Sequence, residues 1–262
     1  MEQEELCNII TDSSGNYVVQ EVFKICTAEE RIQIMEKIEE KLIDLSCHKK
    51  GTHSIQTLVV ELKSPDEIKR FLDIIKGKEL ILSSNSYGTF VLQKVVDHFP
   101  EDLLVQIHDI CRDNFIEMAT SNNGLPIIKK ALAKFKRSKH SFVDIIEEHT
   151  NSLAQHHFGN YAIQVAIENW DQEDWKKIFE IVLNNLQQLS MQKISSNVVE
   201  KCIDKASQDT IKEFMNVINN KEFIKMLIRN MYAFFVVERA LMRSTDHEVK
   251  VQIAHEILSN IK

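Results

Sequence analysis

The chain has 262 residues, 44% of them hydrophobic, and is long enough to bury a large core as one elongated domain or as two globular ones. Its formal net charge of −7 argues weakly against nucleic acid as a partner, because proteins that bind phosphates tend to be basic. The apolar runs are too short to span a bilayer, the acidic N-terminus is unlike a signal peptide, and five cysteines without CxxC spacing indicate reduced thiols in an intracellular protein.

Five of the six glycines recur with a nearly constant period. Gly15, Gly51, Gly88, Gly124 and Gly159 are separated by 36, 37, 36 and 35 residues. The segments that begin there read GNYVVQ, GTHSIQ, GTFVLQ, GLPIIK and GNYAIQ, and SSNVVE from Ser195 and AFFVVE from Ala233 continue the series without glycine. A fixed period of roughly 20–50 residues is typical of a solenoid, in which each repeat buries its apolar face against its neighbours.

Each of these seven segments predicts an amphipathic helix. With the residue after the glycine as position 1, the repeats begin at Asn16, Thr52, Thr89, Leu125, Asn160, Ser196 and Phe234. Positions 3, 4, 7 and 8 are apolar in every copy except at Ser54. This spacing makes one stripe of a helix that is wide enough to face a core. The glycine is expected just before the helix, where the chain turns out of a short preceding helix.

A second helical pattern follows each copy. In the first repeat, apolar residues recur at steps of three and four at Ile32, Met35, Ile38, Leu42 and Leu45. Pro65 and Pro100 stand where the start of such a helix tolerates proline. The sequence therefore predicts an all-α solenoid of about seven repeats of ~36 residues, each with two longer helices and a short one, as a single domain over residues 1–262.

Positions 1, 2 and 5 lie away from the apolar stripe, where a purely structural helix would carry Lys, Glu or Ala. In chain order they read Asn16/Tyr17/Gln20, Thr52/His53/Gln56, Thr89/Phe90/Gln93, Leu125/Pro126/Lys129, Asn160/Tyr161/Gln164, Ser196/Asn197/Glu200 and Phe234/Phe235/Glu238. A planar side chain at position 2 gives an unstacked base a stacking surface worth roughly 1–3 kcal/mol. Side chains one turn apart, at positions 1 and 5, can reach the base's Watson–Crick edge. The pattern favours a reader of single-stranded RNA.

GNYVVQ, GNYAIQ and especially SSNVVEKC resemble the RNA-reading helices of the Pumilio (PUF) family, and the resemblance covers essentially the whole chain. It implies a right-handed crescent of three-helix repeats, with single-stranded RNA antiparallel along the concave face and one base per repeat. It also implies a regulator of mRNA stability or translation that binds GU-containing, UGUA-like elements, expected in mRNA 3′ untranslated regions.

Carried over residue by residue, the resemblance assigns a base to five repeats. Asn16/Tyr17/Gln20 and Asn160/Tyr161/Gln164 would read U, Ser196/Asn197/Glu200 would read G, and Thr52/His53/Gln56 and Thr89/Phe90/Gln93 would be weaker readers of A, with Thr where the family more often has Cys or Ser. The expected RNA is 5′-GU-n-A-A-U-3′.

Two repeats depart from the family's pattern. Leu125/Pro126/Lys129 offers no group for a base edge, and Phe234/Phe235/Glu238 lacks the Asn and Gln of a U reader, so that Phe235 remains as a stacking residue. By order, the visible repeats resemble the family's second to eighth, so that the first repeat and the terminal caps are expected to be missing or atypical.

The residues at position 6 make RNA binding compatible with the negative net charge of the chain. It carries Lys94, Lys130, Lys201 and Arg239, which predicts a modest basic lane beside the reading positions. Affinity is then expected to rest on stacking and hydrogen bonds more than on phosphate neutralisation.

No motif for catalysis or a cofactor is visible, and His156 and His157 lack the Cys/His spacing of a metal site. We therefore expect no enzyme, cofactor, metal or membrane partner. The expected protein is a cytoplasmic monomer, or alternatively a nuclear or nucleolar one, that binds mRNA and recruits protein effectors on its convex face.

Two alternative functions stay open. A sequence-degenerate PUF-like RNA binder in ribosome biogenesis would tolerate any base where Glu200 is expected to demand G. A protein-binding α-solenoid that has lost RNA recognition is favoured by the altered codes at Leu125 and Phe234.

Overall fold

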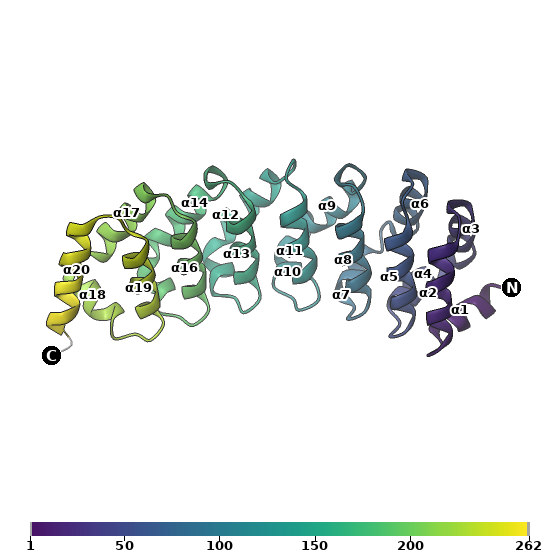
Figure 1. Ribbon diagram of the computed structural model, residues 1–262, viewed down its shortest axis with the longest axis horizontal. Helices are drawn as coiled ribbons and strands as arrows, with labels where there is room; N and C mark the ends of the chain where they lie inside the picture. The colour runs from purple at the N-terminus through teal and green to yellow at the C-terminus, as the bar shows by residue number, and fades with distance from the viewer. Residues whose placement is uncertain (1, 261–262) are drawn as a thin grey trace. The chain divides into compact units, whose positions relative to one another are not determined.

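The structure is a computed structural model that describes residues 2–260. Regular structure in this range is entirely helical, with α-helices α1–α20 and two 3-10 helices, η1 and η2 (Figure 1). No β-strand forms among residues 2–260, so the all-α prediction is confirmed. No helix in the described part of the chain is both long and apolar enough to cross a bilayer.

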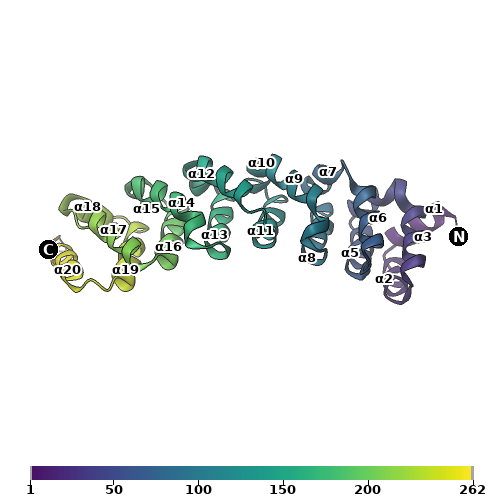
Figure 2. The same cartoon turned by 90° about the horizontal axis from the view of Figure 1, so that it is seen from above.

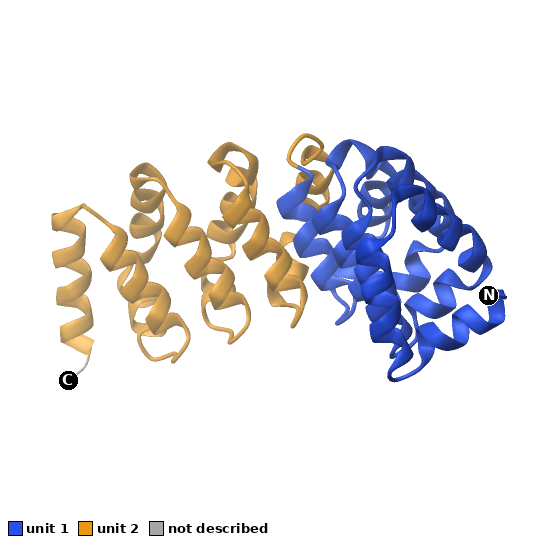
Figure 3. Cartoon of the chain, turned by 45° about the vertical axis from the view of Figure 1, so that its right-hand side comes forward, with its two compact units in different colours: residues 1–135 blue, residues 136–262 orange. Residues whose placement is uncertain are grey.

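The helices group into two compact units, residues 1–135 and residues 136–262 (Figure 3). Unit 1 contains α1 (Gln3–Thr11), α2 (Gly15–Ile25), α3 (Ala28–Ile38), η1 (Glu39–Lys41), α4 (Leu42–Ser46), α5 (Gly51–Glu61), α6 (Pro65–Ile75), α7 (Glu79–Ser84), α8 (Gly88–His98), η2 (Glu101–Leu103), α9 (Val105–Asp113), α10 (Phe115–Ala119) and α11 (Leu125–Lys134). Unit 2 contains α12 (His140–Gln155), α13 (Gly159–Asn169), α14 (Gln172–Asn184), α15 (Leu186–Ser190), α16 (Ser195–Lys205), α17 (Gln208–Ile218), α18 (Lys221–Leu227), α19 (Ala233–Arg243) and α20 (His247–Asn260). The single domain expected over residues 1–262 stays a prediction.

Within each unit the helices that carry positions 1–8 pack side by side. These reading helices are α2, α5, α8 and α11 in unit 1 and α13, α16 and α19 in unit 2. Seen from above, the reading helices of each unit lie along one face, and most of the remaining helices lie behind them (Figure 2). The reading positions of successive repeats are therefore brought together on one side of each unit.

The core of each unit lies between these layers. In unit 1, Phe71 and Phe99 are fully buried and pack edge to face with ring centroids 6.0 Å apart. In unit 2, Phe179 lies between Trp175 and Phe214, with centroid distances of 6.3 and 6.4 Å. The Phe71–Phe99 and Phe179–Phe214 contacts join one repeat to the next.

The apolar stripe is buried in most reading helices, as the sequence predicts. In α8, Val91, Leu92 and Val95 are at most 1% exposed. The prediction is wrong for Val18 and Val22 of α2, which are 63% and 37% exposed. The cause is position in the array, because α2 packs on α5 but no reading helix precedes it in the described chain.

The second helical pattern proves to be two helices. The run expected through Leu45 breaks after Ile38, and the 3-10 helix η1 leads into α4. α4 packs against α5 and serves as the short helix of the following repeat. Pro65 begins α6 as expected, inside a capping box of Ser64 and Glu67, whereas Pro100 precedes η2 rather than a longer helix.

At Gly51 a close approach, and not a left-handed backbone angle, favours glycine at the start of the reading helix. A Cβ added to Gly51 would lie 2.6 Å from the carbonyl oxygen of Leu45, at the end of the short helix α4. In the sixth repeat Ser195 stands at this place, and its Oγ donates a hydrogen bond to the carbonyl of Leu189 at 2.7 Å. The periodic glycine therefore marks where the preceding helix approaches the reading helix; at Gly159 that helix is the 16-residue α12, not the separate short helix that the sequence predicted.

We expect Gly51→Ala to lower the free energy of unfolding by about 1–3 kcal/mol, because the opposing atom is backbone and cannot rotate away. Urea denaturation followed by circular dichroism measures the change. Ala233→Gly is the matched control, since the seventh repeat already accommodates a Cβ at this position, and it should cost no more than about 1 kcal/mol. Equal stability of Gly51→Ala and the wild type would contradict the close approach.

Candidate nucleic-acid interface

Planar side chains stand out from the reading helices at position 2. Tyr17, Phe90, Tyr161 and Phe235 are 65%, 48%, 48% and 53% exposed, although their neighbours at positions 3 and 4 are mostly buried. The other two side chains predicted to stack, His53 and Asn197, are also exposed. Exposed rings on a packed helical face leave a large apolar area in water, which a stacked base would cover.

Position 1 differs from the expectation drawn from the sequence. Its side chains were expected in exposed places, but they are buried: Asn16, Thr52, Thr89, Asn160 and Ser196 are at most 4% exposed. The asparagine or threonine side chain at position 1 donates to backbone carbonyl groups of the turn before its helix, as Asn160 does, or of the following repeat, as Thr52 does. Direct contact of these five residues with a base stays a prediction.

Positions 1 and 5 are joined by a hydrogen bond within the helix. In four repeats the Nε2 of the position-5 glutamine donates to the oxygen at position 1: Gln20 to Asn16 at 3.0 Å, Gln56 to Thr52 at 3.0 Å, Gln93 to Thr89 at 3.3 Å and Gln164 to Asn160 at 2.9 Å. Position 5 is half-buried, so its outer part remains reachable. Position 1 thus fixes the orientation of the amide at position 5.

The side chain of Asn160, at position 1 of the fifth repeat, is hydrogen-bonded at both its nitrogen and its oxygen. Its Nδ2 donates to the carbonyls of His156 and His157 at 2.9 and 2.8 Å, and its Oδ1 accepts from Gln164. The second Nε2 hydrogen and the Oε1 of Gln164 then form a fixed donor and acceptor pair. Such a pair matches the O4 acceptor and N3–H donor of uracil.

The threonines at position 1 are held by the neighbouring repeat instead. The Oγ1 of Thr52 donates to the carbonyl of Tyr87 at 3.1 Å, and that of Thr89 donates to the carbonyl of Asn123 at 2.6 Å. Each of these hydroxyls also accepts from the glutamine at position 5. Thr52 and Thr89 therefore each join their own reading helix to the backbone just before the next reading helix of unit 1.

A set of capping residues four positions before position 1 was missed from the sequence. The side chain of each capping residue accepts a hydrogen bond from a backbone N–H group at the start of the reading helix. The six capping residues are Asp12, His48, Asn85, Ser121, His156 and Asn230. His156 accepts at Nδ1 from Phe158 and Gly159, both at 3.1 Å. The signal was present, because every repeat carries a polar residue three places before its glycine or the equivalent position.

Glu200 is the one acidic residue at position 5 among the five repeats with a predicted base. Its side chain is 22% exposed and lies 3.6 Å from the Nη2 of Arg239 on α19. Burial raises the pKa of the Glu200 carboxyl, Arg239 opposes this rise, and Asp204 and Glu238 add to it, so that the pKa lies above its ordinary value. A half-buried carboxylate with free lone pairs suits a ligand that brings two N–H donors.

The basic lane at position 6 is paired with acids. Three of its four cations meet the acid at position 9 of the preceding repeat: Lys130 with Asp97 at 2.6 Å, Lys201 with Glu168 at 3.0 Å and Arg239 with Asp204 at 3.6 Å. The modest basic lane predicted from the sequence therefore stays a prediction, and the structure adds that three of its four cations are paired with acids. Their charges join neighbouring repeats, which is consistent with an acidic protein whose face is not a strong phosphate attractor.

The two repeats that depart from the pattern also differ in structure. Leu125 is buried and Pro126 half-buried, so this part of α11 presents an apolar surface. Phe234 is 48% exposed, unlike every other residue at position 1, and its ring meets Phe235 edge to face with centroids 5.8 Å apart. Neither helix offers a position 1 that could fix a polar group at position 5.

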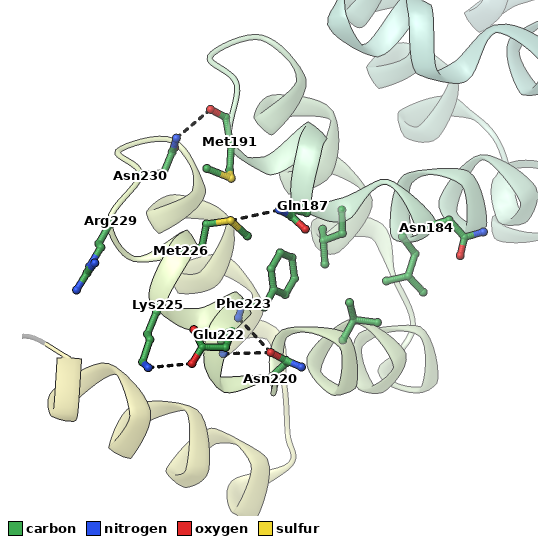
Figure 4. Close-up of a pocket in the computed structure, with 13 residues that line it drawn as sticks. Asn184, Gln187, Met191, Asn220, Glu222, Phe223, Lys225, Met226, Arg229 and Asn230 are labelled. Carbon is green, nitrogen blue, oxygen red and sulfur yellow. Dashed lines mark hydrogen bonds and ion pairs between the residues drawn. The ribbon is translucent and has the colours of Figure 1, made fainter.

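An open groove lies away from the reading helices in unit 2. It has a volume of about 990 Å³ and lies between α14, α15, α17 and α18, with Phe223 and Met226 among its apolar residues and Asn184, Gln187 and Arg229 among its polar ones (Figure 4). No residue of α13, α16 or α19 lines it. Among residues 2–260 there is also no group of three or more His, Cys, Asp or Glu placed to hold a metal ion.

Comparison with known proteins identifies the repeats. The model of the Pumilio-family RNA binding repeat matches residues 6–39, 41–75, 80–107, 149–183 and 185–218, more than half of the chain. Each matched segment contains one of the five reading helices to which the sequence assigns a base. The repeats that begin at Leu125 and Phe234 lie outside the matched segments.

Relatives and solved structures agree with this match. The chain is 26% identical to the Pumilio domain-containing protein C6G9.14 of Schizosaccharomyces pombe and 29% identical to Pumilio homolog 12 of Arabidopsis thaliana, over 90% and 91% of its length. It spans only 35% and 41% of those two proteins.

The fold resembles the Puf4 RNA binding domain bound to an HO endonuclease RNA 3′ UTR recognition sequence, with a TM-score of 0.91 at 24% identity over 99% of this chain and 83% of that one. It also resembles PUF-8 in complex with PBE-RNA, with a TM-score of 0.88 at 20% identity over 98% of this chain and 78% of that one. The predicted α-solenoid of repeats is thereby confirmed. The chain belongs to the Pumilio family of RNA-binding repeat proteins.

Proposed function

We propose that this chain binds single-stranded RNA sequence-specifically, with one nucleobase at each of the five reading helices that carry an intact code. The observation that carries the proposal is the fixed amide at position 5 beside an exposed plane at position 2, as in Gln164 with Tyr161. A donor and acceptor held in place next to a stacking surface can select a base by its edge.

We propose GU-containing, UGUA-like elements in mRNA 3′ untranslated regions as the targets, and control of mRNA stability or translation as the outcome. Support comes from the acidic reading position at Glu200, which suits guanine, and from Gln164 in the adjacent repeat, which suits uracil. The similar Puf4 domain was solved with a 3′ UTR recognition sequence. The family is one of RNA-binding repeats, and we propose that the chain carries no catalytic activity.

We expect the chain to bind 5′-GUUAAU-3′ and to lose about tenfold to a hundredfold in affinity when the first G becomes C, because cytosine offers only one donor to Glu200. Fluorescence anisotropy with labelled RNA measures this. Changing the third base, which faces the α11 repeat, is the matched control and should alter affinity less than threefold.

The same titrations separate the alternative functions. Equal affinity for every sequence would favour a degenerate RNA binder, and no binding to any of the RNAs would favour a protein-binding solenoid. We further propose a cytoplasmic monomer that recruits effector proteins, which sedimentation analysis and cell fractionation test.

A further inference from the structure

Arg239 on α19 spans two carboxylates of the preceding reading helix. Its Nη2 lies 3.6 Å from Oε2 of Glu200, and its Nη1 lies 3.6 Å from Oδ1 of Asp204. Glu200 and Asp204 are one helical turn apart on α16, so a single guanidinium reaches both from the next repeat. The arrangement places a fixed positive charge beside the proposed guanine reader.

Acids outnumber cations around this reader. The charged groups that act on Glu200 are Asp204 on its own helix and Arg239 and Glu238 on α19. Lys201, the next residue along α16, is paired with Glu168 at 3.0 Å. Without Arg239 the half-buried carboxylate of Glu200 would face two like charges and no opposite one.

The charge of Glu200 decides what it can bind. An ionised carboxylate accepts both the N1–H and the N2–H of guanine, whereas a carboxylic acid keeps a hydroxyl that opposes one of these donors. The protonated form can instead donate to N1 of adenine. The preference for guanine therefore requires the carboxylate, and protonation weakens it.

We propose that Arg239 is a specificity-determining residue that keeps the guanine-reading carboxylate of Glu200 charged and in place. It is a positioning residue, since it acts through Glu200, and the proposal rests on the proposed function. Burial and the two neighbouring acids hold the pKa of Glu200 above its ordinary value, and Arg239 is the group that lowers it.

The other pairs at position 6 lack this role. Lys130 pairs with Asp97 at 2.6 Å, but position 5 of the repeat before it is the neutral Gln93. Lys201 likewise stands beside a repeat whose position 5 is Gln164. Among the described pairs at this position, the one made by Arg239 alone reaches a titratable reading residue.

The test compares affinity for RNA beginning with G and with A between about pH 5 and pH 7.5, by anisotropy at constant ionic strength. In the wild type the preference for G should fall as pH falls, because Glu200 takes up a proton. In Arg239→Gln the preference for G over A should be lost at a higher pH than in the wild type. Near pH 5.5 the ratio of the two affinities should be about threefold to fivefold below that of the wild type. Asp204→Asn should move the loss to lower pH, and Arg239→Lys should restore the wild-type profile in part.

Lys130→Gln is the matched control, because it removes the same kind of inter-repeat pair without touching Glu200, and it should leave the profile unchanged. Coincident pH profiles of the wild type and Arg239→Gln, with both preferring G, would overturn the role of Arg239. A wild type with no preference for G at any pH would instead refute the proposed function. Shifts of opposite sign for Arg239→Gln and Asp204→Asn cannot arise from general loss of structure.

Discussion

Replacing Glu67 by Gln is expected to lower the free energy of unfolding at neutral pH by about 3–5 kcal/mol, because it leaves the guanidinium of Arg31 buried without its counter-charge. Glu67 is 1% exposed and Arg31 is 9% exposed, and Nε of Arg31 lies 2.7 Å from Oε1 of Glu67. Arg31 also donates to the carbonyl groups of Phe23 and Cys26. The pair joins the outer helices α3 and α6, so its loss should loosen the first two repeats.

The same carboxylate has a second structural role, at the start of α6. Its Oε2 accepts backbone hydrogen bonds from Lys63 at 3.2 Å and Ser64 at 2.9 Å. Burial raises the pKa of Glu67, but the hydrogen bonds from Ser64, Arg31 and Lys63 outweigh burial and hold the pKa below its ordinary value of 4.5. The stabilisation is therefore complete above about pH 4.5 and is lost as pH falls through the lowered folded-state pKa.

Urea denaturation of the wild type and Glu67→Gln at about pH 7 and about pH 3 measures both effects. The difference between the two proteins should shrink at the lower pH. Glu39→Gln is the matched control, since it breaks the more exposed pair of Glu39 with Arg70 on the same two repeats and should cost less than about 1 kcal/mol. A loss for Glu67→Gln no larger than that of the control would show that the buried pair contributes little.

The largest effect on binding is expected from Glu200→Gln. This substitution should lower the affinity for RNA beginning with G by about tenfold to a hundredfold, because a neutral amide cannot accept both guanine donors. The fold should not suffer, since a half-buried carboxylate whose pKa is raised disfavours the folded state once it is ionised. The melting temperature should be unchanged or slightly higher.

Glu238→Gln provides the comparison. It makes the same chemical change at position 5 of the seventh repeat, where Phe234 is exposed and no residue at position 1 could hold the side chain. Its effect on the same RNA should be below threefold by anisotropy titration. Similar losses for the two variants would mean that the acids act through general charge and not through guanine recognition.

The architecture could be predicted from the sequence because the repeat contains glycine and apolar residues at fixed positions, and each of these residue types indicates one structural feature. Glycine at a position such as Gly51 indicates that the backbone of another helix lies close by. The spacing of Val91, Leu92 and Val95 indicates a buried helix face. The residues of α2 alone do not show which reading helices pack against it, so the exposure of Val18 could not be predicted from the stripe. In the described chain α5 is the reading helix that packs on α2, and Val18 lies outside that contact.

The site was predictable in residue identity but not in geometry. Helical angles place position 1 away from the stripe, yet Asn160 is buried because the preceding turn supplies carbonyl groups that its amide satisfies. Likewise, the sequence places Lys201 in the basic lane but does not show its partner, because Glu168 lies 33 residues earlier and reaches Lys201 only when the repeats pack together. The burial of position 1 and the pairing of position 6 depend on contacts outside the reading helix, which the sequence of that helix does not show.

The most direct test of base reading is selection of RNA from a random pool by the wild-type chain and by Glu200→Gln in parallel. We expect wild-type selection to enrich G followed by U, opposite α16 and α13, and to leave the next position unselected opposite α11. Glu200→Gln should lose the enrichment at G alone. Recovery of unbiased sequences by the wild type, or of the same G-containing sequences by Glu200→Gln, would contradict base reading.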